Sequence, residues 1–432
     1  MYVFSRGKQG VVLRFVGLLV LGLVLSLSAP VYAENSSSTI YSDVEQSVYQ
    51  IRVINKQTGK KNAIGSGFVV QEGNLIATNY HVVSTFINDP EDFELDFLST
   101  NGKTGTLQLL TVDVIHDLAV LKTDMPLGTP LQIGEVPAKG ARLYSLGNPL
   151  DKGFSIVEGT NNGVMKSSDD NNILFSGSLN PGMSGGPTLN EQKQVIGVNV
   201  ATSGNGISFL VPAQYLAALL QRLKDTDYQP ESDIREKISE QLRSNAEKYL
   251  QRLQNAKWST LRAGQFVAVP GDIEGATRCW DNSEKPAPND LMRTSYTRCD
   301  NENSIYLDEG LDVGKLAYEY IWLTSDKMIP ARFYRRYEEL NSSLPDSNAG
   351  EQDVTNFSCY TNFTTVAGQD FKMTVCRRDY LNYAGLSDLL ITGALVGHEQ
   401  KGMLFNLDMT GVPFESGMQL FRRMLEEFKW QN

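Results

Sequence analysis

Short apolar runs, separated by turn-forming residues, fill the stretch from about residue 40 to residue 212. Glycine, asparagine or aspartate repeatedly interrupts the pattern, and no helical pattern lies between the runs. They read GSGFVV (65–70), NLIATNYHVV (74–83), LAVLK (118–122), RLYSLG (142–147), VIGVNV (195–200) and ISFLVP (207–212). Many short strands at such spacing are typical of an all-β barrel or sandwich. The first part of the chain is therefore predicted to be mainly β.

Two helical patterns follow these runs. AQYLAALLQRL (213–223) places its leucines on one face, which predicts a helix that closes a first domain at residues 34–225. A charged segment comes next, in which apolar residues recur at steps of three and four: Ile234, Ile238, Leu242, Ala246, Tyr249 and Leu253. This predicts an amphipathic linker helix within residues 226–260. Its apolar face is expected to pack against one of the domains rather than against a partner.

Strand and helix patterns are mixed in the last segment, residues 261–432. KLAYEYIWL (315–323) alternates like a strand, whereas ARFYRRYEEL (331–340) has the spacing of a helix. Further runs are NFSCYTNF (356–363), FKMTVC (371–376), LLITGALV (389–396), GMLFNLDM (402–409) and a final helix holding Phe414, Met418, Phe421, Leu425 and Phe428. Antiparallel strands with a terminal helix predict an α+β domain.

All four cysteines lie in this last domain, at Cys279, Cys299, Cys359 and Cys376. An even count suggests disulfides, with three possible pairings. If the AGQD turn is centred between residues 367 and 368, Cys359 and Cys376 face each other on adjacent strands. Cys279 and Cys299 bracket one loop, so the favoured pairs are 279–299 and 359–376. Zinc is disfavoured, because no CxxC occurs and His398 is the one histidine downstream.

The first 33 residues have the pattern of a secretory signal. Arg6, Lys8 and Arg14 precede the apolar run FVGLLVLGLVLSLSA (15–29), and a small residue, Ala33, ends the segment. The run is short for a membrane span, which needs about 20 residues, although an uncleaved anchor remains an alternative. We expect an exported protein, periplasmic or secreted, whose mature form begins near Glu34.

The charge balance excludes some classes of partner. The 432 residues carry a formal net charge of −11, and no basic tract occurs. Binding to nucleic acid or to an anionic membrane needs basic surface, so neither is expected.

The octapeptide NPGMSGGP (180–187) holds a serine among glycines. Ser184 becomes a nucleophile only if a base takes its proton and backbone N–H groups receive the oxyanion. Glycines at 182, 185 and 186 suit a loop that presents its amides, although a plain turn between strands is the alternative reading of the octapeptide alone.

Among the three histidines, His81 is best placed to be the base. It lies at the end of an apolar strand pattern, where an imidazole can be held rigidly beside a cleft, and Asp117 at the start of LAVLK can fix its tautomer. His116 is expected to be a surface neighbour and His398 a solvated turn residue. The chain order is thus His81, Asp117, Ser184, which is one of the known orders of a serine-hydrolase triad.

Seven segments, GSGFVV, TNYHVV, DLAVLK, SLGNP, NPGMSGGP, VIGVNV and GISFLVP, follow each other in an order that resembles the HtrA/Deg-type trypsin-like proteases. The resemblance covers about residues 40–225. It implies a chymotrypsin-like double β-barrel with the active site between two six-stranded barrels. With the helix and the α+β domain described above, the predicted fold class is mainly β.

The resemblance also implies roles for individual residues. Ser184 would be the nucleophile, His81 the general acid and base, and Asp117 the orienting carboxylate, with the N–H groups of Gly182 and Ser184 as the oxyanion hole. The substrate would lie against the edge at Val200, Ala201 and Thr202, and against a pocket with Ser178 at its base and Gly206 to Phe209 on one wall. No carboxylate lies at that base, so a small or medium apolar side chain is expected. No metal or organic cofactor is implied.

The chain departs from its relatives at two points. Met183 cannot accept the ion pair that an acidic residue before the serine makes in trypsin-like zymogens, which raises the question of whether the oxyanion loop is ordered at rest. No PDZ pattern occurs between residues 230 and 432, so the last domain would recruit substrate, bind a protein partner or gate the cleft. The sequence leaves the oligomeric state open. The alternative function is a secreted binding or scaffold protein that has lost turnover and acts through its C-terminal domain.

Overall fold

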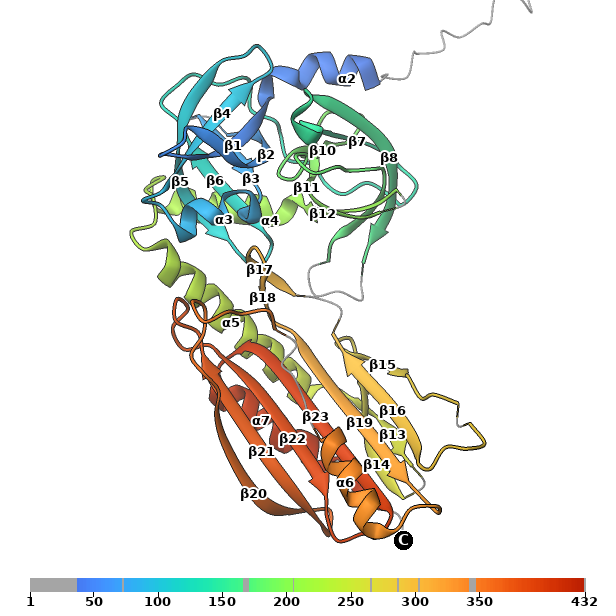
Figure 1. The fold of residues 1–432 in the computed structure, drawn as a ribbon. Helices are drawn as coiled ribbons and strands as arrows, with labels where there is room; N and C mark the ends of the chain where they lie inside the picture. The colour runs from blue at the N-terminus through green and yellow to red at the C-terminus, as the bar shows by residue number, and fades with distance from the viewer. Residues whose placement is uncertain are drawn as a thin grey trace, which may run out of the picture.

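The structure of the chain is a computed structural model, shown in Figure 1. It describes residues 37–71, 74–165, 171–204, 206–264, 266–285, 287–301, 304–341 and 347–430. The predicted secretory signal, residues 1–33, lies outside the described residues.

The first barrel is a closed antiparallel sheet of six strands in the order β1-β2-β3-β6-β5-β4. The strands are β1 (Val48–Asn55), β2 (Lys60–Val70), β3 (Leu75–Thr78), β4 (Phe93–Ser99), β5 (Thr104–Asp113) and β6 (Leu118–Lys122), preceded by helix α2 (Ser37–Val44). Alternate side chains point inward, as a strand period of two requires: Ile51 and Val53 of β1 pack with Val69 and Ile76 in one core.

The second barrel repeats this architecture in the order β10-β11-β12-β9-β8-β7. Its strands are β7 (Arg142–Gly147), β8 (Ser155–Val164), β9 (Ile173–Ser176), β10 (Pro187–Leu189), β11 (Val195–Gly204) and β12 (Ile207–Pro212). Helix α4 (Ala213–Asp225) follows, and its buried leucines contact a core that includes Phe68 of the first barrel and Tyr144 of the second. The predicted double β-barrel is therefore confirmed.

One predicted strand is in part a helix. The run 74–83 was expected to be extended throughout, but β3 ends at Thr78 and helix α3 (Tyr80–Asn88) begins two residues later. Tyr80, Val83 and Ile87 are all buried and recur at helical steps, so tertiary packing favours the helix over the β-branched propensity of this segment. His81 accordingly lies in the first turn of a helix and not at a strand end.

The C-terminal domain is built on a seven-stranded antiparallel sheet in the order β15-β16-β19-β23-β22-β21-β20. Its strands are β15 (Arg278–Asp281), β16 (Arg293–Asp300), β19 (Leu316–Thr324), β20 (Ser358–Val366), β21 (Gln369–Asp379), β22 (Ser387–Leu395) and β23 (Lys401–Val412). Smaller sheets are formed by β13 (Trp258–Ala263), β14 (Val267–Ile273) and β24 (Lys429–Trp430), and by β17 (Ile305–Asp308) and β18 (Leu311–Val313).

Helices cover both faces of this sheet. On β23, Phe405 packs with Leu420 and Phe421 of α7 (Phe414–Glu426), whereas the adjacent Leu404 packs with Phe333 of α6 (Pro330–Leu340). Neighbouring residues of a strand point to opposite faces, so the two helices lie on opposite sides.

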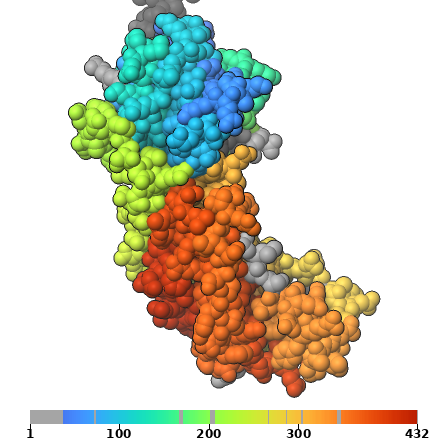
Figure 2. Space-filling model, turned by 60° about the vertical axis from the view of Figure 1, so that its left-hand side comes forward, coloured from blue at the N-terminus to red at the C-terminus, as the bar shows by residue number. Residues whose placement is uncertain are grey.

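The linker helix α5 (Ile234–Asn255) packs against both domains, not against one of them as predicted. Ile238 and Leu242 are buried with residues of the first barrel, whereas Leu250 and Leu253 are buried in the core of the C-terminal sheet. Figure 2 shows this yellow-green segment running along the molecule from the barrels onto the red C-terminal domain. None of the helices in the described part of the chain is long and apolar enough to cross a membrane.

Both disulfides have the predicted pairing. Cys279 and Cys299 face each other across β15 and β16, and Cys359 faces Cys376 across β20 and β21. The turn of the second hairpin falls at Ala367 and Gly368, as the sequence indicated.

Candidate active site

His81 and Asp117 form a two-point contact in the first barrel. Nδ1 of His81 lies 2.7 Å from Oδ2 of Asp117, and the backbone N–H of His81 donates to Oδ1 at 2.9 Å. One carboxylate thus fixes both the imidazole and the first turn of α3. An imidazole held at Nδ1 in this way presents Nε2 to a substrate as a base.

The backbone at Asp117 adopts a conformation that is uncommon for a residue with a side chain. Its φ is 53°, in the left-handed region, at the turn between β5 and β6. The side-chain amide of Asn79, the residue before α3, donates to the carbonyl oxygen of Asp117 at 2.8 Å. A residue keeps such an unfavourable backbone conformation only when the surrounding contacts hold it there, and residues of this kind cluster at active sites.

The environment of His81 favours its protonated form. Burial lowers the pKa of His81, but the charge of Asp117 and its hydrogen bond raise it, and the net result is a pKa above the ordinary value of 6.5. The imidazole side chain remains 27% exposed. A histidine paired with a carboxylate in this way can act as a general base, and the carboxylate stabilises the imidazolium that then forms.

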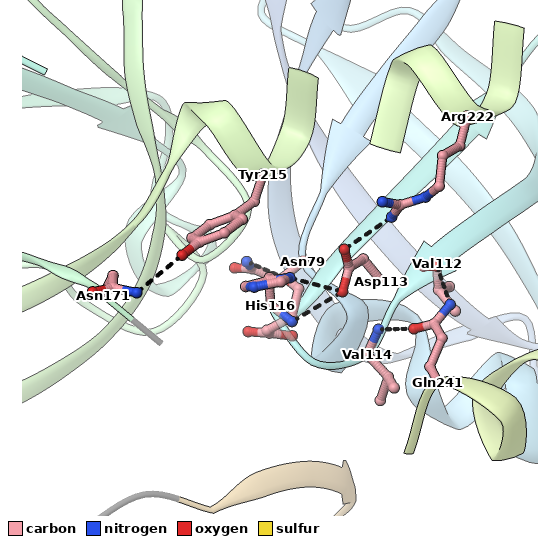
Figure 3. Close-up of polar contacts among 10 residues, drawn as sticks. Asn79, Val112, Asp113, Val114, His116, Asn171, Tyr215, Arg222 and Gln241 are labelled. Atoms are coloured by element: carbon pink, nitrogen blue, oxygen red, sulfur yellow. Dashed lines mark hydrogen bonds and ion pairs between the residues drawn. The ribbon is translucent and has the colours of Figure 1, made fainter. Parts of the chain in front are cut away.

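A polar network holds the turn that carries Asp117 (Figure 3). Asp113 lies between His116, whose Nδ1 is 3.0 Å from Oδ1, and Arg222 of α4, which donates to Oδ2 at 3.0 Å. Burial works to raise the pKa of Asp113, but hydrogen bonds and charges from His116 and Arg222 prevail and hold that pKa below its ordinary value. The ring of His116 also stacks on Tyr215, with ring centroids 3.7 Å apart.

The linker helix fastens the same turn from the other side. The side chain of Gln241 on α5 accepts from the N–H of Val114 and donates to the carbonyl of Val112, both at 2.8 Å. Sequence reasoning identified Asp117 in the HD pair but missed Asp113 and Gln241, and it placed His116 at the surface. His116 is instead half-buried within this network, and the missed signal was the second carboxylate three residues before it.

Two glycines shape the loop of Ser184. Gly182 and Gly185 have φ values of 93° and 83°, which side chains rarely adopt. A Cβ at either position would also collide with a backbone oxygen, that of Asn148 or of Ser66. Replacement by any other residue would therefore displace the loop.

Ser66, in the GSG motif of β2, ties this loop to the first barrel. Its N–H donates to the carbonyl of Ser184 and its hydroxyl to the carbonyl of Gly182, both at 2.7 Å. Because these carbonyls are held by Ser66, the loop's amides face elsewhere. The GSG motif alone gave no signal for this role of Ser66.

The N–H groups of Gly182 and Ser184, predicted to form the oxyanion hole, donate to no residue in the described parts of the chain. Met183 and Gly186 in the same loop donate to Asn180 and Met183. An oxyanion on a substrate bound at Ser184 would need two such N–H donors that are not already engaged.

The hydroxyl of Ser184 points to the second barrel in this state. Its Oγ donates to the carbonyl of Val200 at 2.8 Å, and among the described residues no hydrogen bond joins it to Nε2 of His81. Any transfer of this proton to His81 would first require a rotation about the Cα–Cβ bond of Ser184.

Met183 is fully buried and anchors the loop. It packs in the core of the second barrel with Leu143, Ile173, Phe175, Leu179, Ile196 and Leu210. Met183 cannot make an ion pair, and the loop is held instead by the burial of its apolar side chain. The oxyanion loop is therefore ordered in this structure.

The residues predicted to bind substrate lie on the second barrel. Ser178 is exposed, and a Cβ at Gly206 would lie 3.8 Å from its Oγ, so the two positions are neighbours. On β11, Ala201 and Thr202 pair with β12, whereas the pairing with β10 reaches no further than Val198. Beyond that point the second edge of β11 has no strand partner in the described parts of the chain.

No group of three or more His, Cys, Asp or Glu in the described part of the chain is arranged to hold a metal ion.

Comparison with known proteins supports this description. Residues 65–198 match the family "Trypsin-like peptidase domain". Serine protease HTRA1A of Danio rerio is 32% identical over 213 residues, which are 44% of this chain and 43% of that protein. Serine protease HTRA2, mitochondrial, of Drosophila virilis is 32% identical over 168 residues, 37% and 39% of the two chains.

The crystal structure of the serine endoprotease from Yersinia pestis is similar over 44% of this chain and 66% of that chain, with 23% identity and a TM-score of 0.39. The chain spans less than half the length of the curated relatives it matches. The family match at residues 65–198, which lie within the barrels, confirms the predicted resemblance to trypsin-like proteases there.

Proposed function

Because the two barrels form a trypsin-like peptidase domain, we propose that this chain is a serine endopeptidase that cleaves protein chains through an acyl-enzyme. One observation carries the proposal: the paired His81 and Asp117 accompany a serine loop with two unengaged N–H donors. Each role in peptide-bond hydrolysis has a candidate residue.

The proposed reaction has the following steps. Ser184 turns from Val200 toward His81, whose Nε2 takes the hydroxyl proton as Oγ attacks the scissile carbonyl carbon. The N–H groups of Gly182 and Ser184 receive the oxyanion, and the imidazolium returns the proton to the leaving amine as the C–N bond breaks. Water, activated by His81, then attacks the ester and releases Ser184.

The substrate is proposed to be an extended protein segment. Its backbone would add to the open edge of β11 at Val200, Ala201 and Thr202, which is the usual mode of strand addition. A small or medium apolar side chain would enter beside Ser178 and Gly206, because the residues assigned to that pocket bring no charge.

A fluorophosphonate probe tests the activity. It should label the wild-type protein at Ser184, and it should not label Ser184→Ala. A cleavage-site profile on denatured proteins, with both variants, would give the specificity. If the correctly oxidised wild type takes up no probe, the alternative of a non-catalytic binding protein replaces this proposal.

Export is proposed on two sequence features, the positively charged apolar leader and the cysteines, which pair as disulfides in the structure. Disulfides persist in oxidising compartments. N-terminal sequencing of the protein from its native host should find a start near Glu34, and a start at Met1 would contradict cleavage.

A further inference from the structure

A hairpin of the C-terminal domain reaches the histidine of the active site. Strands β17 and β18 lie beside helix α3 (Figure 1), and the ring of Tyr306 stands edge-on to the ring of His81. The centroids are 5.9 Å apart and the planes meet at 75°. This is the geometry of a favourable aromatic pair.

The hairpin is fastened to both ends of α3. At the first turn, the phenol of Tyr80 donates to the carbonyl of Leu307 at 2.8 Å, and at the last, the amide of Asn88 donates to Asp308 at 2.6 Å. Leu307 is fully buried between these two bonds. Tyr306 is therefore held in a fixed place over the helix that carries His81.

The C-terminal domain in turn holds the hairpin. Val313, a buried residue of β18 in the hairpin, packs against Gly411 of β23, where any Cβ would collide with the valine side chain. Leu307 and Leu311 share one core with Tyr380, Tyr383 and the α3 side chains. The position of Tyr306 thus depends on the C-terminal sheet.

His81 needs such a support. Asp117 fixes Nδ1, yet a single hydrogen bond leaves the imidazole able to tilt about its side-chain torsions. Tyr306 is half-buried, and burial raises the pKa of its phenol, with the Asp117 carboxylate among the nearby charges that add to this. The ring contact therefore lies within the electrostatic reach of the His81–Asp117 pair.

From this juxtaposition we infer that Tyr306 is a positioning residue, supplied by the C-terminal domain, that keeps the imidazole of His81 aligned for proton transfer. The inference rests on the proposed function, since it assigns His81 the part of base. The domain that was expected to recruit partners or gate the cleft would then complete the catalytic centre itself.

The first test compares Tyr306→Ala and Tyr306→Phe in the full chain. The rate of reaction with a small fluorophosphonate, which has no peptide to bind, should fall about ten- to a hundredfold for the alanine variant, as misplaced catalytic groups do. The phenylalanine variant keeps the ring and should react like wild type. Tyr360→Ala, at a tyrosine 69% exposed on β20, is the matched control and should have no effect.

Two results would overturn the inference: an alanine variant as fast as wild type, or a phenylalanine variant as slow as the alanine variant. If only the KM for peptides rises while the fluorophosphonate rate is unchanged, Tyr306 contacts substrate and does not position His81. Thermal melts of all variants separate loss of folding from loss of alignment.

The second test does not need turnover. In the Ser184→Ala background, the proton on Nδ1 of His81 should give a low-field NMR signal, identified by its loss in His81→Ala. We expect Tyr306→Ala to broaden it by faster exchange with water, and Tyr306→Phe to preserve it. An unchanged signal would refute the positioning role, whereas failure of wild type to label with the probe would refute only the proposed function.

Discussion

At the scale of single residues, Met183 shows how an apolar side chain can hold the loop of Ser184. Met183, the residue before the proposed nucleophile, is fully buried among six hydrophobic neighbours of the second barrel. The adjacent backbone of Gly182 and Ser184 is thereby set at the mouth of the site without any ion pair. The loop's order depends on how well this side chain fills its place.

Truncation of Met183 should therefore be costly. Met183→Ala should lower the free energy of unfolding by about 2–5 kcal/mol, because it leaves a cavity in a packed core. Met183→Leu, which nearly conserves the volume, should cost less than about 1.5 kcal/mol and serves as the control. Urea unfolding measures both, and equal stability of the alanine variant and wild type would contradict the anchoring role.

Asp117 is expected to matter for chemistry more than for folding. Asp117→Asn can keep the contact to His81 but favours the wrong tautomer, so kcat should fall by about 10⁴-fold. The control is Asp124→Asn, at an exposed carboxylate just after β6. Steady-state kinetics on a peptide substrate check this, and a loss of less than tenfold would remove Asp117 from the triad.

The pH dependence of kcat/KM should follow His81. Burial lowers its pKa, but Asp117 outweighs that effect, so the pKa lies above the ordinary value of 6.5. The neutral imidazole is the active base, hence kcat/KM should rise with pH and reach half its maximum above 6.5. Loss of the negative charge in Asp117→Asn should move this midpoint down, and a wild-type midpoint below 6.5 would contradict the assignment.

At the scale of elements, the linker helix α5 supports the turn of Asp117. Gln241→Ala removes both of its hydrogen bonds to the backbone of Val112 and Val114 and leaves those groups without that partner. The expected cost is about 1–3 kcal/mol. Hydrogen exchange should quicken at residues 112–117, whereas Gln251→Ala, exposed on the same helix, should change nothing. Unaltered exchange in the turn would mean that α5 does not brace it.

The elements also show where sequence patterns succeed. Short apolar runs broken by glycine predicted an all-β barrel or sandwich, and the family resemblance implied that there are two barrels. Equal spacing about Ala367 and Gly368 predicted one disulfide. Helix α3 was missed because its β-branched residues continue the apolar run of β3, and only burial against distant segments decides between the two structures. The helical step from Tyr80 to Val83 and Ile87 was the available signal.

At the scale of the whole molecule, one core crosses the domain boundary. Side chains of the first barrel, α3, α5 and the β17–β18 hairpin share a single buried cluster. Sequence alone could pair His81 with Asp117, since their motifs are local, but it could not place Tyr306 beside His81, more than two hundred positions away. The hairpin itself had a signal, since IYLD (305–308) and LDV (311–313) flank a Glu-Gly turn.

Disruption at the edge of the C-terminal sheet should affect the active site less than disruption of the strand that contacts the β17–β18 hairpin. The disulfide of Cys359 and Cys376 closes the outermost hairpin, and β20 is three strands away from β23, against which Val313 and the β17–β18 hairpin rest.

Replacing both cysteines by serine should destabilise the protein by about 3 kcal/mol, as expected for a loop of roughly this length. Below the melting temperature, the fluorophosphonate rate should stay at the wild-type value, because the hairpin's contacts with Gly411 and its shared core with Tyr380 and Tyr383 do not include the cysteines. Melting curves with and without the disulfide, together with labelling rates, test both halves. A slowed reaction in a protein that is still folded would show instead that the whole sheet, edge included, sets the position of the hairpin.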